Sequence, residues 1–174
     1  MKIIKTKWFW WWGWNPQKLE DWLEEMASYG WNLYQVDMWG IRFRFRKEKS
    51  EKIRYCVDYQ SSVDENYLSI LKDDGWDIVW TGATGWYLLK KIYEEKRPSI
   101  FTDANSLIER NNRLTKILKP LFVLIIAMFI FLIINRNHGN DLFIGLYIVL
   151  ISFYGYLFYQ IHKYNKKLKN NIKE

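Results

Sequence analysis

The chain has 174 residues, of which 49% are hydrophobic and 19% aromatic, so it has room for one modest domain with appendages. Its net charge of +7 is unevenly placed: residues 1–100 carry 16 basic and 15 acidic side chains, a balance of +1, whereas residues 101–174 carry 10 and 4, a balance of +6. Because the front part is nearly neutral, the pI of about 9.3 gives no reason to expect nucleic-acid binding.

An unusually aromatic stretch, KWFWWWGWNP, runs from Lys7 to Pro16. The stretch is too short, and contains a lysine too close to its aromatic residues, to cross a bilayer. All eleven tryptophans lie between Trp8 and Trp86, and the chain after them is rich in Leu, Ile, Phe, Asn and Lys. We therefore expect two compositional units, the first of them an aromatic-rich domain over residues 1–98.

Two segments placed 45 residues apart share one pattern. WLEEMASYGWNL at residues 22–33 aligns without gaps with YLSILKDDGWDI at residues 67–78, and Gly40 aligns with Gly85. Each copy predicts an amphipathic helix that ends at a glycine and is followed by two strands.

We place the two copies of this pseudo-repeat at residues 6–47 and 51–92. The alternation in IRFRFRK, residues 41–47, is close to period two and indicates one buried and one wet sheet face. Together these patterns predict an α+β fold: two tandem β-α-β-β units that form a ferredoxin-like, two-layer antiparallel sheet of six strands, with two helices on one face.

The 45-residue shift also divides the aromatic side chains of the first strand between two faces. Trp8, Trp10 and Trp12 align with apolar residues of the second copy and are expected in the core, whereas Phe9 and Trp11 fall on a more polar, open face. The ligand- or partner-binding surface that we expect on this open face consists of Phe9, Trp11, Arg42, Arg44, Arg46, Arg54 and Tyr87.

Aromatic rings among arginines fit an amphipathic anion, a protein partner or lipid headgroups. The plain alternative is a solvated sheet face on which arginines lie over aromatic rings. Such a face is also found in RNA-recognition sheets, but the sequence contains no RNP-like string, so we expect no nucleic-acid partner.

Two apolar segments follow, at residues 117–134 and 142–161, with a short loop at residues 135–141 between them. They are 18 and 20 residues long, which is the length of a transmembrane helix. The alternative is that they are two buried helices of a soluble domain, but such helices normally keep a polar stripe, and these segments have none. Basic residues precede the first segment and follow the second, so the positive-inside rule predicts a two-pass cell-membrane protein with both termini and the front domain in the cytoplasm. Residues 99–116 are then a juxtamembrane linker or helix, and residues 162–174 a basic cytoplasmic tail.

Some residues of the two apolar segments predict local features. Lys119 and Pro120 are expected at the entry of the first span, where a lysine can snorkel to the interface and a proline costs the helix least. Gly145, Ser152 and Gly155 are small residues that we expect to let the two spans pack closely.

The sequence offers little chemistry. His138 and His162 have no cysteine or acidic neighbour at metal-ligand spacing, and the adjacent Asp73 and Asp74 point in different directions on a helix. One free cysteine fits a reducing compartment. We expect no catalytic residue, no metal and no cofactor, with a lipid-modifying enzyme that uses Asp58 as the weakest alternative.

Five blocks that occur in order along the chain, WLEEMASYGWNL, RYCVDYQ, DDGWDIV, GWYLLKK and IFTDANS, resemble the bacterial domain-of-unknown-function family 2812 over roughly residues 5–108. The resemblance implies a small Firmicutes membrane protein in which this domain precedes hydrophobic spans, often encoded near PadR-type transcriptional regulators. It implies a role in envelope-stress or antimicrobial sensing, and it carries over no catalytic residue.

Two functions remain open at this stage. The leading hypothesis is a membrane-anchored cytoplasmic sensor or adaptor domain that binds a protein partner or an amphipathic ligand at the open sheet face. The alternative is an integral-membrane accessory or immunity subunit of a transporter complex, which acts through its transmembrane hairpin. In both cases the expected partners are the lipid bilayer and a protein, either a regulator or a transporter subunit.

Overall fold

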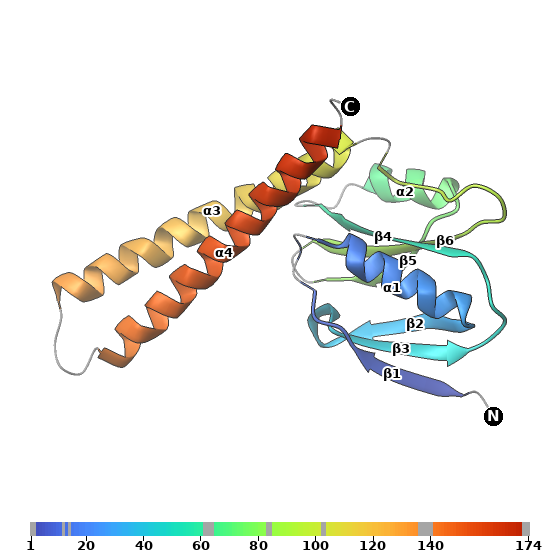
Figure 1. Cartoon of the computed structure of the whole chain (residues 1–174), viewed down its shortest axis with the longest axis horizontal. Coiled ribbons are helices and arrows are strands. Elements are labelled where there is room, and N and C mark those ends of the chain that lie inside the picture. Colours follow the sequence, from blue (N-terminus) through green and yellow to red (C-terminus); the bar gives the residue numbers. More distant parts are fainter. Residues whose placement is uncertain are drawn as a thin grey trace.

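The computed structural model describes residues 3–11, 13, 15–60, 65–82, 85–101, 104–135 and 141–171. The chain forms an α+β domain followed by two long helices that make a hairpin, and Figure 1 shows this hairpin leaving the domain on one side. The last turns of the second long helix return to the domain, so the described C-terminal end lies beside it.

The first half of the domain is a β-α-β-β unit. Its elements are β1 (Ile4–Trp8), α1 (Gln17–Ser28), β2 (Trp31–Asp37), a short 3-10 helix η1 (Met38–Gly40) and β3 (Arg42–Lys47). The strands are antiparallel in the order β1-β3-β2.

The second half repeats this order of elements. It consists of β4 (Ile53–Tyr59), α2 (Glu65–Asp73), β5 (Asp77–Thr81) and β6 (Trp86–Ile92), with the antiparallel strand order β4-β6-β5. The predicted α+β class, with two tandem β-α-β-β units and a C-terminal apolar hairpin, is confirmed. The strands do not form one continuous sheet of six, because β2 and β5 approach each other without pairing, and each unit keeps its own three-stranded sheet.

The two units agree in their irregularities as well as their elements. Both sheets have a register shift in their second strand, between Leu33 and Gln35 and between Ile78 and Trp80, which is a spacing of 45 residues. The turn before the last strand of the second unit requires a glycine, because Gly85 has φ +93° and a Cβ there would lie 2.0 Å from the carbonyl oxygen of Gln60.

The main core lies between the two sheets and around α1. Leu19, Leu23 and Ala27 of α1 are at most 1% exposed, and they belong to one cluster with Phe43 of the first sheet and Val57 of the second. Helix α1 thus covers the inner faces of both sheets, and Figure 1 shows it between β4 and the first sheet.

Helix α2 covers the other face of the second sheet. Its Leu71 packs with Cys56, Trp76 and Leu89 in a separate cluster. Every residue of β4 is buried, so both of its faces are covered: Ile53, Tyr55 and Val57 belong to the cluster around α1, and Cys56 belongs to the cluster under α2. The two helices therefore lie on opposite faces of the second sheet. The expectation that both helices lie on one face is wrong.

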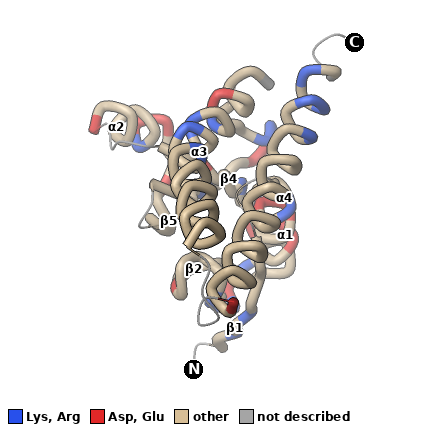
Figure 2. The backbone as a smooth tube through the Cα atoms, turned by 90° about the vertical axis from the view of Figure 1, so that its left-hand side faces the viewer, with Lys and Arg blue, Asp and Glu red and all other residues tan. Residues whose placement is uncertain are grey.

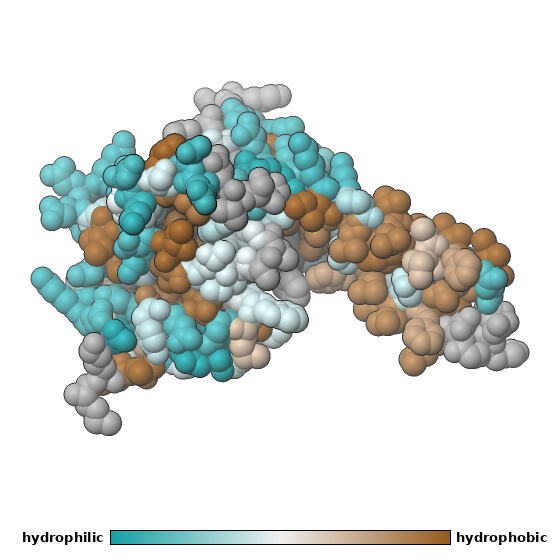
Figure 3. Space-filling view, turned by 180° about the vertical axis from the view of Figure 1, so that it is seen from behind, coloured by the Kyte–Doolittle hydropathy of each residue, from teal (hydrophilic) through white to brown (hydrophobic). Residues whose placement is uncertain are grey.

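The hairpin consists of α3 (Ala104–Ile134) and α4 (Asp141–Asn171), each of 31 residues. A helix of that length is about 46 Å long, which exceeds the roughly 30 Å of a bilayer's hydrocarbon core. Both helices are long and apolar enough to cross a membrane, and their apolar parts are exposed, with Val123 and Val149 each 65% accessible. Figure 3 shows a continuous hydrophobic surface over the hairpin, and Figure 2 shows most charged residues of α3 and α4 at the ends near the domain.

Two local expectations for the hairpin are wrong. Pro120 lies inside α3 rather than at its start, because the helix begins at Ala104 and includes the predicted juxtamembrane linker. Gly145 and Gly155 do not mediate close packing of α3 against α4, since a Cβ at either position would meet open space, and Ser152 is exposed as well. Most of the predicted connecting loop, residues 136–140, lies outside the described part of the chain.

Candidate functional site

The structure reverses the predicted faces of the first strand. Phe9 stacks on Trp22 of α1 with a centroid separation of 4.7 Å, and the indole Nε1 of Trp11 donates to the carbonyl oxygen of Gly40 over 2.6 Å. In contrast, Trp8 is 53% exposed and Trp10 is 66% exposed. The pair that we expected on the open face therefore contributes to the core. Trp12, which we also expected in the core, lies outside the described residues.

Strand register explains the reversal. In the first sheet Trp8 pairs with Arg42, whereas in the second sheet Tyr87, which lies 45 residues after Arg42, pairs with Asp58. Trp8 therefore corresponds to Asp58, a shift of 50 rather than 45 residues. The difference of five is odd, and because side chains alternate along a strand, an odd slip moves each of them to the opposite face.

Arg42, Arg44 and Arg46 do share one exposed sheet face, but their charges have partners. Both carboxylate oxygens of Asp37 accept from Arg42, and Arg44 lies 3.4 Å from the same carboxylate. The hydrogen bond from Arg42 lowers the pKa of Asp37 below its ordinary value.

The remaining contacts of this face are similar. Arg46 lies 3.7 Å from Glu48 and 4.8 Å above the ring of Tyr34, and Arg42 lies 5.8 Å from the ring of Trp8. This arrangement is the solvated sheet face that we considered as the plain alternative.

The other two predicted binding residues lie elsewhere. Tyr87 is 3% exposed and belongs to the cluster under α2. Arg54 is 7% exposed and forms ion pairs with Glu20 and Glu24 of α1, at 2.9 and 2.5 Å. The seven predicted residues therefore do not form one surface, and only the three arginines of β3 lie on a common face.

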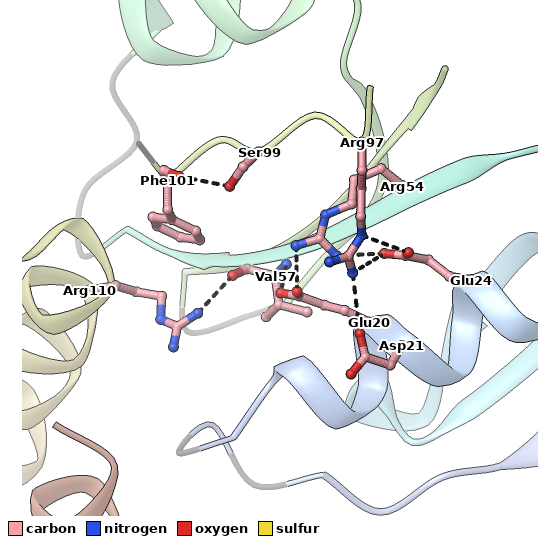
Figure 4. Close-up of polar contacts among 9 residues, drawn as sticks. All are labelled: Glu20, Asp21, Glu24, Arg54, Val57, Arg97, Ser99, Phe101 and Arg110. Atoms are coloured by element: carbon pink, nitrogen blue, oxygen red, sulfur yellow. Dashed lines mark hydrogen bonds and ion pairs between the residues drawn. The ribbon is translucent and has the colours of Figure 1, made fainter. Parts of the chain in front are cut away.

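A different polar site forms where the free edge of β4 meets the helices. Because β4 is at the end of its sheet, its outward backbone groups need other partners. The N–H of Val57 donates to Oε1 of Glu20 over 2.9 Å, and the carbonyl oxygen of Val57 accepts from Nη1 of Arg110 over 3.2 Å. Figure 4 shows Glu20 and Arg110 reaching this peptide from α1 and α3.

Arg110 is buried without an acidic partner. It is 1% exposed, and its contacts among the described residues are the carbonyl oxygen of Val57, Oδ1 of Asn111, the hydroxyl of Tyr164 and the ring of Phe101, whose centroid lies 5.3 Å away. Among the described residues no carboxylate lies within 4.0 Å of its guanidinium. Burial lowers the pKa of Arg110, as expected for a positive charge removed from water without an opposite charge beside it.

The next turn of α3 also contacts the domain. Arg113 donates from Nε to the carbonyl oxygen of Tyr59 over 3.0 Å, and its Nη2 lies 3.3 Å from Oδ1 of Asp58. Asp58 is fully buried and also accepts from Gln60 and from the hydroxyl of Tyr67. Burial, followed by the charge of Asp58, raises the pKa of Tyr67. Three donors thus fix the position of the Asp58 carboxylate.

A cavity of about 180 Å³ lies at this junction, and we call it the junction cavity. Its lining residues come from the start of α1, from β4, from the segment before α3 and from both long helices: Pro16, Gln17, Glu20, Arg54, Ser99, Phe101, Leu107, Arg110 and Tyr164. In Figure 4 Arg110 approaches from α3 and Arg54 from the opposite side, with Ser99 and Phe101 beside the space between them. A larger hollow of about 270 Å³ next to α2 has no buried charged residue in its lining.

Within the junction cavity, Arg54 has an unused donor. Its Nη1 and Nη2 donate to Glu24 and Glu20, but its buried Nε has no partner among the described residues. The N-cap residue of α1, Pro16, makes no side-chain cap, and Pro16 and Gln17 at that end line the cavity. The cavity therefore combines two guanidinium groups and the positive end of a helix with one carboxylate, that of Glu20, whose two oxygens are already hydrogen-bonded.

Comparison with known proteins adds a family but no activity. The family described as protein of unknown function (DUF2812) matches residues 15–123. This range includes α1, the second sheet and the part of α3 that carries Arg110 and Arg113, and it excludes the aromatic stretch before residue 15. No curated protein and no solved structure matches the chain. Because the matched range covers more than half of the 174 residues, the chain belongs to the DUF2812 family of proteins of unknown function.

Proposed function

We propose that the protein is a membrane-anchored sensor or adaptor whose α+β domain and helical hairpin work as one coupled unit. The observation that carries the proposal is the burial of Arg110 and Asn111, each 1% exposed on the helix that leads into the first apolar segment. A tether that only kept the domain near a membrane would need no buried polar contact with it. With these contacts, a displacement of either part is passed to the other.

Apolar contacts support the same coupling. Tyr59 at the end of β4 packs with Leu114 of α3 and Ile161 of α4, which are 8% and 4% exposed. The two helices are also joined to each other here, since Nδ2 of Asn111 donates to Oδ1 of Asn165 over 2.6 Å. The domain and both helices thus share one interface.

The proposal places the hairpin in the cell membrane and the domain on the cytoplasmic side. Support comes from the exposed apolar surface of the hairpin, which is far larger than a soluble monomer usually exposes. Exposed lysines flank the apolar segments on the domain side, at Lys116, Lys119, Lys163, Lys166 and Lys167. Arg110 and Arg113 are bound to the domain, so they are no longer counted as free flanking charges. A role in envelope-stress or antimicrobial sensing remains a prediction from the family resemblance.

An exchange of the membrane part tests the proposal. Residues 119–134 and 142–156 are replaced by unrelated apolar segments, while the chain up to Leu118 and from Leu157 onward is kept, because these two residues still pack at the junction. In-cell cross-linking with mass spectrometry then compares the partners of the exchanged protein with those of the native one. We expect the partner set to survive the exchange.

A junction variant makes the test decisive. Arg113→Gln with Leu114→Ser removes the contacts to Asp58 and Tyr59, and we expect it to lose the partner set while remaining in the membrane. The matched control is Asn112→Ser with Lys116→Gln, two exposed positions on the same helix, which should behave as native. The opposite pattern, with partners lost on exchange and kept in the junction variant, overturns the proposal.

That opposite pattern would support the second candidate, an accessory or immunity subunit that acts through its hairpin on a transporter. The observation in its favour is that Gly145, Ser152 and Gly155 face away from α3. Small residues on an outward helix face are typical of contacts between transmembrane helices of different chains.

A further inference from the structure

The two arginines that line the junction cavity differ in their partners. Glu20 uses one carboxylate oxygen for the N–H of Val57 and the other for Arg54, and no described carboxylate lies within 4.0 Å of Arg110, although Glu20 and Asp58 act on it over a longer distance. A buried guanidinium is normally stable only when an opposite charge or a full set of acceptors compensates it. Glu20, Asp21 and Glu24 together equal the charge of Arg54, Arg97 and Arg110, but among the described residues Arg110 is the one arginine of this group that no carboxylate contacts directly.

The donors with spare capacity converge on the same space. Within the described part of the chain, Nε of Arg54 is buried without a hydrogen-bond partner, Arg110 has only neutral hydrogen-bond partners, and Pro16 at the N-cap of α1 supplies no side-chain cap. The hydroxyl of Tyr164 also interacts with Arg110 at this cavity. Guanidinium groups and helix N-termini are the donors that bind phosphate in proteins, because they match its charge and its several acceptor oxygens.

We propose that the junction cavity binds a phosphate group, held by Arg110, by Nε of Arg54 and by the first N–H groups of α1. The group belongs either to a free phosphate compound or to the headgroup of a phospholipid. Helix geometry allows both sources, because Arg110 lies seven residues, or about 10 Å, before the apolar segment begins at Ile117. This inference deepens the proposed coupling by naming a ligand at the same junction.

Thermal unfolding of the full-length protein in detergent tests the inference. Its tryptophan fluorescence is followed with increasing inorganic phosphate at constant ionic strength, with chloride as the replaced anion. A ligand that binds only the folded protein raises its transition temperature with concentration, so we expect a rise in phosphate that chloride does not produce.

Two variants and a control assign the effect to the cavity. Gln17→Glu puts a negative charge at the start of α1, where it favours the helix but repels phosphate. The variant should therefore fold, and its affinity for phosphate should be at least about tenfold lower than that of the native protein. Arg110→Gln should give a similar loss. Arg97→Gln is the matched control, because Arg97 belongs to the same ion-pair cluster through Glu24 and Asp21 but does not line the cavity.

Two further measurements distinguish the sources of phosphate. Native protein and Gln17→Glu are analysed for co-purified phosphorus, and the phosphate titration is repeated in phosphatidylglycerol nanodiscs. If the ligand is a free phosphate compound, added phosphate should raise the transition temperature in both detergent and nanodiscs. If it is a lipid headgroup, phosphate should raise the transition temperature in detergent alone, and Gln17→Glu should contain less co-purified phospholipid than native protein.

The inference is overturned if phosphate does not raise the transition temperature of native protein and native protein contains the same amount of phospholipid as Gln17→Glu. It is also overturned if phosphate raises the transition temperature of Gln17→Glu as much as that of native protein. The proposed coupling is measured separately by partner cross-linking, so it can fail while phosphate still binds, and the reverse result is equally visible.

Discussion

Nη1 of Arg110 in α3 donates to the carbonyl oxygen of Val57 in β4 over 3.2 Å, although the two residues are 53 positions apart in the chain. Val57 belongs to the edge strand of the second sheet, and its N–H is taken by Glu20 of α1. One peptide group thus joins the sheet, the first helix and the hairpin. The domain is completed at this edge by the helix that leads into the first apolar segment.

Glu20 should be among the most sensitive side chains in the domain. Glu20→Ala leaves the N–H of Val57 unpaired and removes one partner of the buried Arg54, so we expect the free energy of unfolding to fall by about 3 kcal/mol. Asp21→Asn, at the exposed neighbouring position, should change it by less than about 0.5 kcal/mol. Denaturant unfolding of the full-length protein measures both values, and equal effects would contradict a special role for Glu20.

The aromatic stretch offers a test of strand register. Phe9→Ala removes the ring that stacks on Trp22 and should destabilise the protein by about 3 kcal/mol. Trp8→Ala, on the exposed face, should cost no more than about 1 kcal/mol. If the larger loss occurred in the Trp8 variant, the faces would be those first expected from the sequence.

Cys56 should be chemically inert in the folded protein. Burial raises the pKa of its thiol to about 12 from an ordinary value of 9.0, and the thiolate is the reactive form. We expect N-ethylmaleimide to label the native protein far more slowly than the unfolded protein at pH 8. Rapid labelling without loss of structure would show that the cluster under α2 opens easily.

The same thiol sets a pH dependence. Its pKa is higher in the folded state, so its contribution to stability is complete below about pH 9, where both states are protonated. As pH rises from about 9 toward 12, the unfolded chain ionises first and that contribution is lost. The free energy of unfolding of Cys56→Ala and of native protein is compared over this pH range. The variant should lack the part of the decrease in stability above about pH 9 that comes from the thiol.

Trp39 should lie close to lipid in the membrane-bound protein. It is 95% exposed in η1, and Figure 1 shows the connection between β2 and β3 at the end of the domain from which the hairpin leaves. Tryptophan is enriched at membrane interfaces, so brominated lipids should quench native fluorescence more than that of Trp39→Phe. Trp76→Phe is the control, because Trp76 is 2% exposed and its removal should leave the quenched intensity unchanged. Equal quenching of native protein and Trp39→Phe would place η1 away from the bilayer.

Local sequence patterns were enough to predict the elements of the fold. The alternation of arginine and phenylalanine from Arg42 to Arg46 predicts a strand with one buried face, and Phe43 and Phe45 are fully buried. Gly30 and Gly75 each follow a helix with positive φ, as expected for helix ends. The apolar segments predict long helices by composition alone. Each of these features depends on residues that are neighbours in the chain.

The candidate site could not be predicted in the same way. The gapless shift concealed an insertion: Phe9 to Gly30 is 21 positions, whereas the equivalent span from Tyr59 to Gly75 is 16. These five extra residues change which side chains of β1 face the core. Their effect is visible only in the pairing of β1 with β3.

The sequence by itself determined the class of fold, the two β-α-β-β units and the apolar hairpin, because side-chain periodicity and hydrophobicity act locally along the chain. Only the tertiary structure decided which aromatic residues are buried and that Arg110 closes the edge of β4 rather than standing free beside the apolar segment. The physical reason is that strand register and edge pairing are set by hydrogen bonds between residues far apart in sequence. A basic residue next to an apolar segment has the same local pattern whether it faces lipid headgroups or a buried carbonyl oxygen.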